Sequence, residues 1–322
     1  MKAAIYSEYG NSDVLHVKDV FKPIPKPNEV LIRVYASTVT SADIMMRKGK
    51  PTIGRLYLGL SRPKRTILGF EFAGEIVELG NAVSQFTIGD RVFGGTTTLG
   101  CYAEYVCVSV EDVVTTMPNN ISFQEAAPVS GSGITVLNFL QGKAKITKNQ
   151  SVLINGASGG VGTYAVQIAK YFGAKVTGVC STSKIDLVRS LGADDVIDYT
   201  KDDFTQNGQK YDIIFDTVSK RSYSEFKSSL TDNGIYLPTV LTFTTFCQMI
   251  WTRMFGNKRV KSSSTGLLPT KERLRYFVEL KELLQTGKIR TVIGDEYPLE
   301  RITEAHAYVE EGHKKGNVII TI

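Results

Sequence analysis

A glycine-rich turn at residues 155–162 is the feature that most constrains how this chain of 322 residues can fold. The turn reads NGASGGVG; an apolar run, 152–154, precedes it, and small and apolar residues at helical spacing follow from 161 to 172. A strand that passes into a helix over small residues lets the backbone approach a pyrophosphate, whose charge the helix N-terminus stabilises. The turn therefore predicts a dinucleotide-binding unit. The residues expected to form this phosphate site are Ala157, Ser158, Gly159, Gly160, Val161 and Gly162.

The order of strand and helix patterns predicts two domains. From Ser151 onward, apolar strand segments alternate with helical segments, which is typical of a parallel sheet with crossover connections. The first third instead carries closely spaced β-branched runs separated by glycine and proline, which favours a barrel-like β domain. The last residues, 317–322, read as a strand that pairs back into the first domain. We therefore expect an α/β fold in which a Rossmann-like domain, 123–268, is inserted between 1–122 and 269–322.

The segment after the second strand of the nucleotide domain indicates which dinucleotide is bound. Enzymes that use NAD place an acidic residue there, about 20 residues beyond the turn, to bind the ribose 2′-hydroxyl. No Asp or Glu occurs between Ala157 and Ile185, whereas Ser181 and Lys184 follow the strand. A lysine and hydroxyls suit a 2′-phosphate, which a carboxylate would repel. The sequence therefore predicts NADPH, with Lys184 as the cation and Ser181 as a hydrogen-bond donor.

Composition excludes several other classes of function. The net charge of +6 helps to attract anions, but no long basic block occurs, so we expect no nucleic-acid partner. Four cysteines form no CxxC pair, and the N-terminus lacks the apolar core of a signal peptide, so we expect a cytoplasmic protein. The apolar stretch 235–255 contains Pro238, Gln248 and five threonines, which favours a strand, a loop and a short helix over a membrane span.

The histidines predict no catalytic metal. A catalytic zinc ion needs three protein ligands, whereas His16, His306 and His313 lie neither near a cysteine nor in a metal-ligand spacing. No GxSxG nucleophile turn occurs either, since Gly131-Ser132-Gly133 is a different pattern. The chemistry is therefore expected to come from the cofactor, while the protein supplies position and polarity.

With these residues in hand, the chain resembles the medium-chain dehydrogenase/reductase superfamily over nearly its whole length, and within it the zinc-free quinone oxidoreductase branch. The block GFEFAG at 69–74 stands where zinc alcohol dehydrogenases carry Gly-His-Glu, so Phe70 replaces a metal-binding histidine. The blocks GDRV at 89–92, ASGGVG at 157–162 and LGAD at 191–194, with the later pair Asp198-Tyr199, also match. The resemblance implies a GroES-like barrel around the Rossmann-like domain.

The resemblance also implies site residues. In such enzymes the lysine after the second strand and the tyrosine of the Asp-Tyr pair hold the 2′-phosphate, which assigns Lys184 and Tyr199. Thr135 corresponds to a residue near the nicotinamide. The Asn-Pro-x-Asp motif of the active site appears as TSAD at 40–43, so Thr40 replaces the asparagine and Asp43 is retained. Near the C-terminus, Asn317 stands where relatives have a cofactor-binding lysine.

The implied reaction is hydride transfer from NADPH to a quinone or an α,β-unsaturated ketone or aldehyde. Phe70 and Tyr57 are candidates for the pocket wall, with the loop after Pro238, and the proton could come from water or Tyr57. Two alternatives stay open: a zinc-free carbonyl or alcohol dehydrogenase, and a non-catalytic NADPH-binding sensor or structural protein. Relatives pair through the edge strand of the nucleotide sheet, so we expect a homodimer, with the apolar segment 235–260 near the contact.

Overall fold

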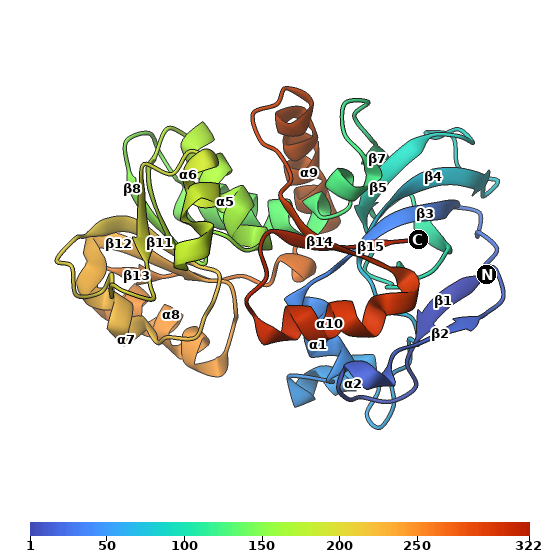
Figure 1. The fold of residues 1–322 in the computed structure, drawn as a ribbon, viewed down its shortest axis with the longest axis horizontal. Helices are drawn as coiled ribbons and strands as arrows, with labels where there is room; N and C mark the ends of the chain where they lie inside the picture. Colours follow the sequence, from blue (N-terminus) through green and yellow to red (C-terminus); the bar gives the residue numbers. More distant parts are fainter. The chain divides into compact units, whose positions relative to one another are not determined.

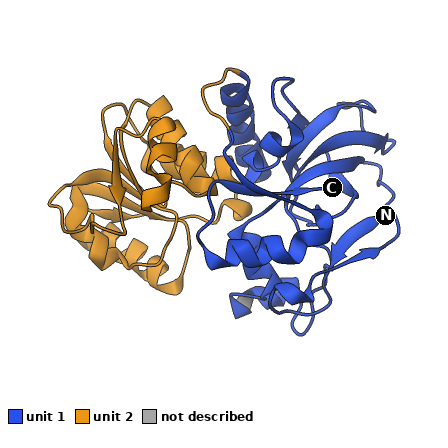
Figure 2. Cartoon of the chain, in the orientation of Figure 1, with its two compact units in different colours: residues 1–131, 270–285, 291–322 blue, residues 132–269, 286–290 orange. Residues whose placement is uncertain are grey.

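The computed structural model describes residues 1–52, 54–56 and 58–322, and these residues form two compact units. Unit 1 comprises residues 1–131, 270–285 and 291–322, and unit 2 comprises residues 132–269 and 286–290 (Figure 2). The insertion of one unit into the other explains why the sequence patterns change character in mid-chain and change back. That the segments 1–122 with 269–322 and 123–268 fold as separate domains stays a prediction.

Unit 2 is built on a six-stranded, all-parallel sheet in the order β10-β9-β8-β11-β12-β13. This is the doubly wound arrangement expected of alternating strands and helices, and α5 and α6 lie on one side of the sheet with α7 and α8 on the other (Figure 1). Its elements are α4 (Ile134–Leu137), β8 (Ser151–Asn155), α5 (Gly160–Tyr171), β9 (Lys175–Cys180), α6 (Ile185–Ser190), β10 (Asp195–Asp198), β11 (Tyr211–Asp216), α7 (Tyr223–Phe226), β12 (Leu230–Pro238), α8 (Phe243–Phe255) and β13 (Arg259–Val260).

Unit 1 is built on a seven-stranded, mostly antiparallel sheet in the order β14-β15-β3-β4-β5-β7, with β6 paired to β3, beside the hairpin-like pair β1-β2. The C-terminal strand β15 pairs antiparallel with β3, which confirms the predicted return of the chain to its first part. Its elements are β1 (Lys2–Ile5), β2 (His16–Asp19), β3 (Glu29–Val39), α1 (Ser41–Arg47), α2 (Arg55–Leu58), β4 (Glu71–Leu79), β5 (Arg91–Gly95), β6 (Tyr105–Ser109), β7 (Val113–Thr116), α3 (Phe123–Ala126), α9 (Thr270–Gln285), β14 (Ile293–Pro298), α10 (Ile302–Glu311) and β15 (Asn317–Thr321).

Apolar clusters on the two sides of the large sheet form the core of unit 1. Alternate residues of β3, including Val30, Ile32 and Val34, are fully buried in one apolar cluster, as the period of a strand requires. The opposite side of the sheet packs on α10 and the N-terminal strand, in a second cluster that contains Tyr6, Tyr102 and Ile320. Burial of side chains of this size contributes about 1.5–3 kcal/mol each, so the sheet holds the polar residues at its strand ends in place.

The apolar stretch 235–255 forms the end of β12, a short connection and the helix α8, which has 13 residues. None of the helices that the structure describes is long and apolar enough to cross a membrane. The sequence predicted a short helix in this stretch, but it did not indicate which side chains of the helix are exposed to solvent.

Candidate active site

The glycine turn joins β8 to α5 as the sequence predicted. Gly156 has φ +81°, a conformation that L side chains rarely adopt, and the amides of Gly156 and Ala157 donate to Val179 O of β9 at 3.1 and 3.0 Å. A Cβ on Gly162 would lie 2.1 Å from Gly156 O, so only glycine lets the helix approach the turn this closely. Gly159 precedes the helix without a capping side chain, which leaves the first amides of α5 for a ligand. This backbone cradle fits a pyrophosphate.

The predicted 2′-phosphate residues lie at the ends of two neighbouring strands. Ser181 and Lys184 directly follow β9, and Tyr199 directly follows β10; the strands pair with Asp198 opposite Cys180. The Tyr199 amide donates to Cys180 O at 3.1 Å, and the Lys184 amide to Ser181 O at 2.9 Å. Burial lowers the pKa of the half-buried Lys184, while Tyr199 is 52% exposed. The fold therefore brings these three residues to one edge of the sheet.

Asp198 is a carboxylate at this edge that the sequence analysis named as part of the Asp198-Tyr199 pair but to which it assigned no role. Its two oxygens accept from the hydroxyls of Thr182 (2.5 Å) and Thr200 (2.7 Å). Hydrogen bonds from these hydroxyls lower the pKa of Asp198, so its negative charge is engaged by local partners. Its place next to Tyr199 in the sequence was a signal that could have assigned it a role at this edge.

A second carboxylate, Asp216, ties together three strand ends beside the glycine turn. Its Oδ1 accepts from Asn155 Nδ2 of β8 at 2.8 Å and from the amides of Val218 and Ser219 at 3.1 and 3.0 Å. Its Oδ2 accepts from the Tyr236 hydroxyl of β12 at 2.7 Å. Asp216 is fully buried, so these four donors replace the water that the charge has lost. The carboxylate therefore positions the loop that follows β11.

In unit 1, the predicted residues Thr40 and Asp43 contact each other. Thr40 is the N-cap of α1: its hydroxyl accepts from the Asp43 amide at 3.3 Å and donates to Asp43 Oδ2 at 2.6 Å. The Thr40 amide also donates to Asp43 Oδ2, at 2.9 Å. This reciprocal capping box uses the hydroxyl proton of Thr40. Burial raises the pKa of Asp43 to about 6.

Glu71 is a buried, hydrogen-bonded carboxylate near these residues, and the sequence analysis did not select it as a site residue. Its oxygens accept from the Thr38 hydroxyl of β3 and from the Gly131 amide. Burial raises the pKa of Glu71 to about 7, and the half-buried Lys314 is close enough for the two groups to interact electrostatically. Burial lowers the pKa of Lys314, and the carboxylates of Glu71 and Asp43 oppose this shift. The available signal was an acid at the start of β4, directly before the apolar pair Phe72-Ala73.

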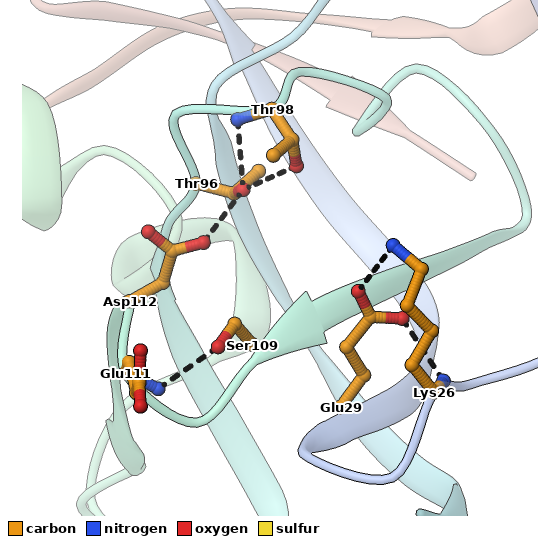
Figure 3. A network of polar contacts seen from close by, with 7 residues as sticks. All are labelled: Lys26, Glu29, Thr96, Thr98, Ser109, Glu111 and Asp112. Carbon is orange, nitrogen blue, oxygen red and sulfur yellow. Dashed lines mark hydrogen bonds and ion pairs between the residues drawn. The ribbon is translucent and has the colours of Figure 1, made fainter.

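The chain around Glu71 is held by a loop whose shape depends on glycine and threonine. Gly69 has φ +93°, and a Cβ there would lie 2.7 Å from the Tyr102 ring. Thr96 donates its amide to Phe70 O at 2.8 Å and its hydroxyl to Asp112 Oδ2 at 3.0 Å (Figure 3). The Thr98 amide donates back to the Thr96 hydroxyl at 3.1 Å. These bonds hold the loop of Thr96 and Thr98 against the backbone of Phe70.

The remaining predicted residues are placed as follows. Phe70 is half-buried and packs on the cluster of Tyr102 and Ile320. Thr135 is half-buried on α4 of unit 2. Asn317 is buried at the start of β15, where its amide group donates to Val292 O at 3.1 Å. Tyr57 lies outside the described residues. The functional roles assigned to these four residues stay predictions.

No group of three or more His, Cys, Asp and Glu residues in the described part of the chain is arranged to hold a metal ion. The cysteine nearest Glu71, Cys101, is buried, and burial raises the pKa of its thiol well above the ordinary value.

Comparison with known proteins agrees with this geometry. The model of the alcohol dehydrogenase GroES-like domain matches residues 26–119, and the model named zinc-binding dehydrogenase matches residues 191–320. A chloroplast envelope quinone oxidoreductase homologue of Arabidopsis thaliana is 32% identical over 99% of this chain and 98% of its own length. An NADPH-dependent alkenal/one oxidoreductase of the same plant is 30% identical over 99% of this chain and 79% of its own length.

Solved structures lead to the same family. The quinone oxidoreductase of Coxiella burnetii is 28% identical and superposes with a TM-score of 0.88, covering 100% of this chain and 99% of its own. The similarity extends along the whole chain and includes both the GroES-like part and the nucleotide-binding part. The chain belongs to the medium-chain dehydrogenase/reductase superfamily, in its quinone oxidoreductase branch.

Proposed function

We propose that this protein is an NADPH-dependent oxidoreductase that transfers a hydride to a quinone or to an α,β-unsaturated ketone or aldehyde. The observation that carries the proposal is the acid-free end of β9 beside the glycine turn, where Lys184 is half-buried and Tyr199 follows the neighbouring strand. The names of relatives, a quinone oxidoreductase homologue and an alkenal/one oxidoreductase, support this class of acceptor. Bound NADPH would supply the hydride.

The residues of unit 2 would hold this cofactor by its phosphates. The first amides of α5 would donate to the pyrophosphate, since nothing within the helix pairs with them. Ser181, Lys184 and Tyr199 would hold the 2′-phosphate. Thr135 and Asn317 complete the proposed set of cofactor residues, Thr135 toward the nicotinamide.

The residues of unit 1 limit how the substrate is polarised. A donor aimed at the developing enolate oxygen stabilises the transition state. The hydroxyl proton of Thr40 is already donated to Asp43, so Thr40 contacts a substrate oxygen only after that bond breaks. Phe70 offers an apolar wall without a donor. We therefore propose water or Tyr57 as the proton source.

We further propose that the reaction needs no zinc and that the enzyme works as a cytoplasmic homodimer. Phe70 in place of a histidine supports a zinc-free reaction. A zinc-free carbonyl or alcohol dehydrogenase would use the same cofactor and the same hydride chemistry. The acceptor therefore has to be identified by experiment.

The test is steady-state NADPH oxidation with a quinone, an enone and a saturated ketone, before and after dialysis against a chelator. We expect turnover with the quinone or the enone, little with the ketone, and no loss after chelation. Tight NADPH binding without turnover of any acceptor would refute the reductase and favour a non-catalytic sensor. Turnover of the ketone alone would favour a carbonyl reductase, and loss of activity after chelation would refute the zinc-free reaction.

A further inference from the structure

Helix α8 of unit 2 turns its apolar side chains toward solvent. Positions 243, 246, 250, 251, 254 and 255 recur at intervals that place them on one face of the helix. Their exposed fractions are 83% for Phe243, 51% for Phe246, 47% for Ile250, 64% for Trp251, 66% for Met254 and 65% for Phe255.

The inner face of the same helix is mostly polar, although the half-buried Met249 packs against the apolar cluster of Tyr236 and Val260. Its two buried residues are Thr245 and Thr252. The Thr252 hydroxyl donates to Gln248 O at 2.8 Å and accepts from the Val260 amide of β13 at 3.0 Å. Thr245 donates its amide to the capping hydroxyl of Thr242 at 3.0 Å. A surface helix of a globular protein ordinarily buries its apolar stripe, so the polarity of α8 is reversed.

The apolar area exposed on the outer face of α8 is larger than one or two isolated residues would expose. Four aromatic side chains with Ile250 and Met254 amount to an apolar patch of roughly 500 Å². A patch of this size is comparable to the largest apolar patch on a typical soluble monomer, and such a patch often serves as an interaction surface. The patch therefore indicates a partner.

The charges around the patch indicate the nature of that partner. Segment 239–263 contains Arg253, Lys258, Arg259 and Lys261, and no acidic residue. Arg253 is exposed, and the guanidinium of Arg259 donates to Thr252 O and Gly256 O, which places its charge at the C-terminal end of α8. Lys258 donates to Lys227 O at 2.8 Å, so a second lysine lies beside it.

A hollow of about 310 Å³ lies at this end of the helix. Trp251 and Phe255 line it together with Lys227, Lys258 and Asp232. It combines an aromatic wall with two cationic side chains, and Asp232 is its one carboxylate among the lining residues described. This combination suits an anionic headgroup attached to an apolar chain.

We propose that the outer face of α8 docks the protein onto an anionic phospholipid bilayer. Helices that lie in the membrane interface combine exposed Trp, Phe and aliphatic residues with Arg and Lys, as this one does. Its 13 residues are too few to span a bilayer. The expected homodimer pairs through the edge strand of the nucleotide sheet, which is β13, and leaves the outer face of α8 to the membrane. A second copy on that outer face would set like charges against each other, whereas an anionic membrane neutralises them. This property is additional to the reductase activity and does not depend on it.

Trp251 makes the proposal directly measurable, because it is the single tryptophan of the chain. The full-length protein is mixed with vesicles of phosphatidylcholine, or of phosphatidylcholine with about 30% phosphatidylserine, the anionic lipid that attracts basic segments. We expect a blue shift of Trp251 emission and co-sedimentation with the anionic vesicles. Both effects should weaken on neutral vesicles and in about 0.5 M salt, where screening shortens the reach of the charges.

Two variants separate the apolar and the charged contributions while keeping the reporter. Phe246→Ser with Ile250→Ser removes apolar area and should lower vesicle partitioning about tenfold or more. Arg253→Glu should lower it about fivefold for each of the two units of charge changed. The matched control is Phe21→Ser with Ile24→Ser, since these side chains are 98% and 83% exposed in unit 1 and should leave partitioning unchanged. NADPH binding by each variant verifies that unit 2 is folded.

Three results would overturn the proposal. Trp251 emission that is insensitive to every vesicle would exclude lipid contact. Equal binding to neutral and anionic vesicles would exclude recognition of anionic lipid. Emission that is blue-shifted without lipid, and that reverts on dilution as a sedimenting dimer dissociates, would assign the face to a second copy of the chain.

Discussion

Replacing Glu71 by glutamine should remove a pH-dependent loss of stability from unit 1. Burial raises the pKa of Glu71 from 4.5 to about 7, so the folded state holds this proton more tightly than the unfolded state does. Below pH 4.5 both states are protonated and the contribution to stability is fully present. Above pH 4.5 the unfolded chain ionises while the folded state keeps its proton, so the contribution declines and is lost once the pH has risen through 7. The shift of about 2.5 units corresponds to about 3 kcal/mol.

The glutamine keeps the contacts but cannot ionise. Its oxygen accepts from the Gly131 amide as the carboxylate does, and its NH₂ group faces Thr38, whose hydroxyl can rotate to accept. We therefore expect the free energy of unfolding of Glu71→Gln, relative to that of the wild type, to rise by up to about 3 kcal/mol between pH 5 and 8. Burial also raises the pKa of Asp43, and the charge of Asp43 contributes to the raised pKa of Glu71, so the difference between the two proteins includes the interaction of these two carboxyls.

The measurement is urea unfolding at pH 5, 6, 7 and 8, followed by far-ultraviolet circular dichroism. Fluorescence of Trp251 reports unit 2 separately, and its transition should respond less to the substitution. The matched control is Glu78→Gln, an exposed acid on the same strand, for which we expect a small difference at every pH. A difference between Glu71→Gln and the wild type that does not change with pH, whatever its sign, would refute the reasoning.

Three further predictions concern unit 2. Lys184→Ala should weaken NADPH binding about 10- to 100-fold, the value of a charge-assisted hydrogen bond, and change NADH binding little; equal losses in a fluorescence titration would contradict the assignment. Gly162→Ala should abolish NADPH binding, because its Cβ would lie 2.1 Å from Gly156 O, whereas Gly266→Ala meets no atom within 4 Å and should bind normally. Asp216→Ala should destabilise unit 2 by about 3–5 kcal/mol in urea, because Tyr236 and Asn155 lose a buried charged partner; a cost below about 1 kcal/mol would argue against its structural role.

The local parts of the fold were predictable because they depend on neighbouring residues. The glycine turn, the strands on either side of it and the return of β15 to the first sheet follow from short patterns of small, apolar and β-branched residues. The boundaries differ slightly, since α5 begins at Gly160 rather than at Val161.

The polar part of unit 1 was less predictable because its members are distant in sequence. Glu71 contacts Gly131, 60 residues away, and Lys314 approaches from the far end of the chain. No periodic pattern encodes such a meeting; the order of strands in the sheet brings it about. Asp216 was visible only as the last residue of an apolar strand, and its four donors come from three segments.

Helix α8 shows most clearly what the sequence alone determines and what only the tertiary structure determines. The sequence alone determined a helical segment with threonines and aromatic residues at helical spacing, and it determined that the flanking charges are all positive. It did not determine which face would be buried, because the same period is compatible with either orientation. The tertiary structure decided that point: the hydroxyl of Thr252 binds the edge strand β13, and this contact turns Trp251 and Phe255 outward.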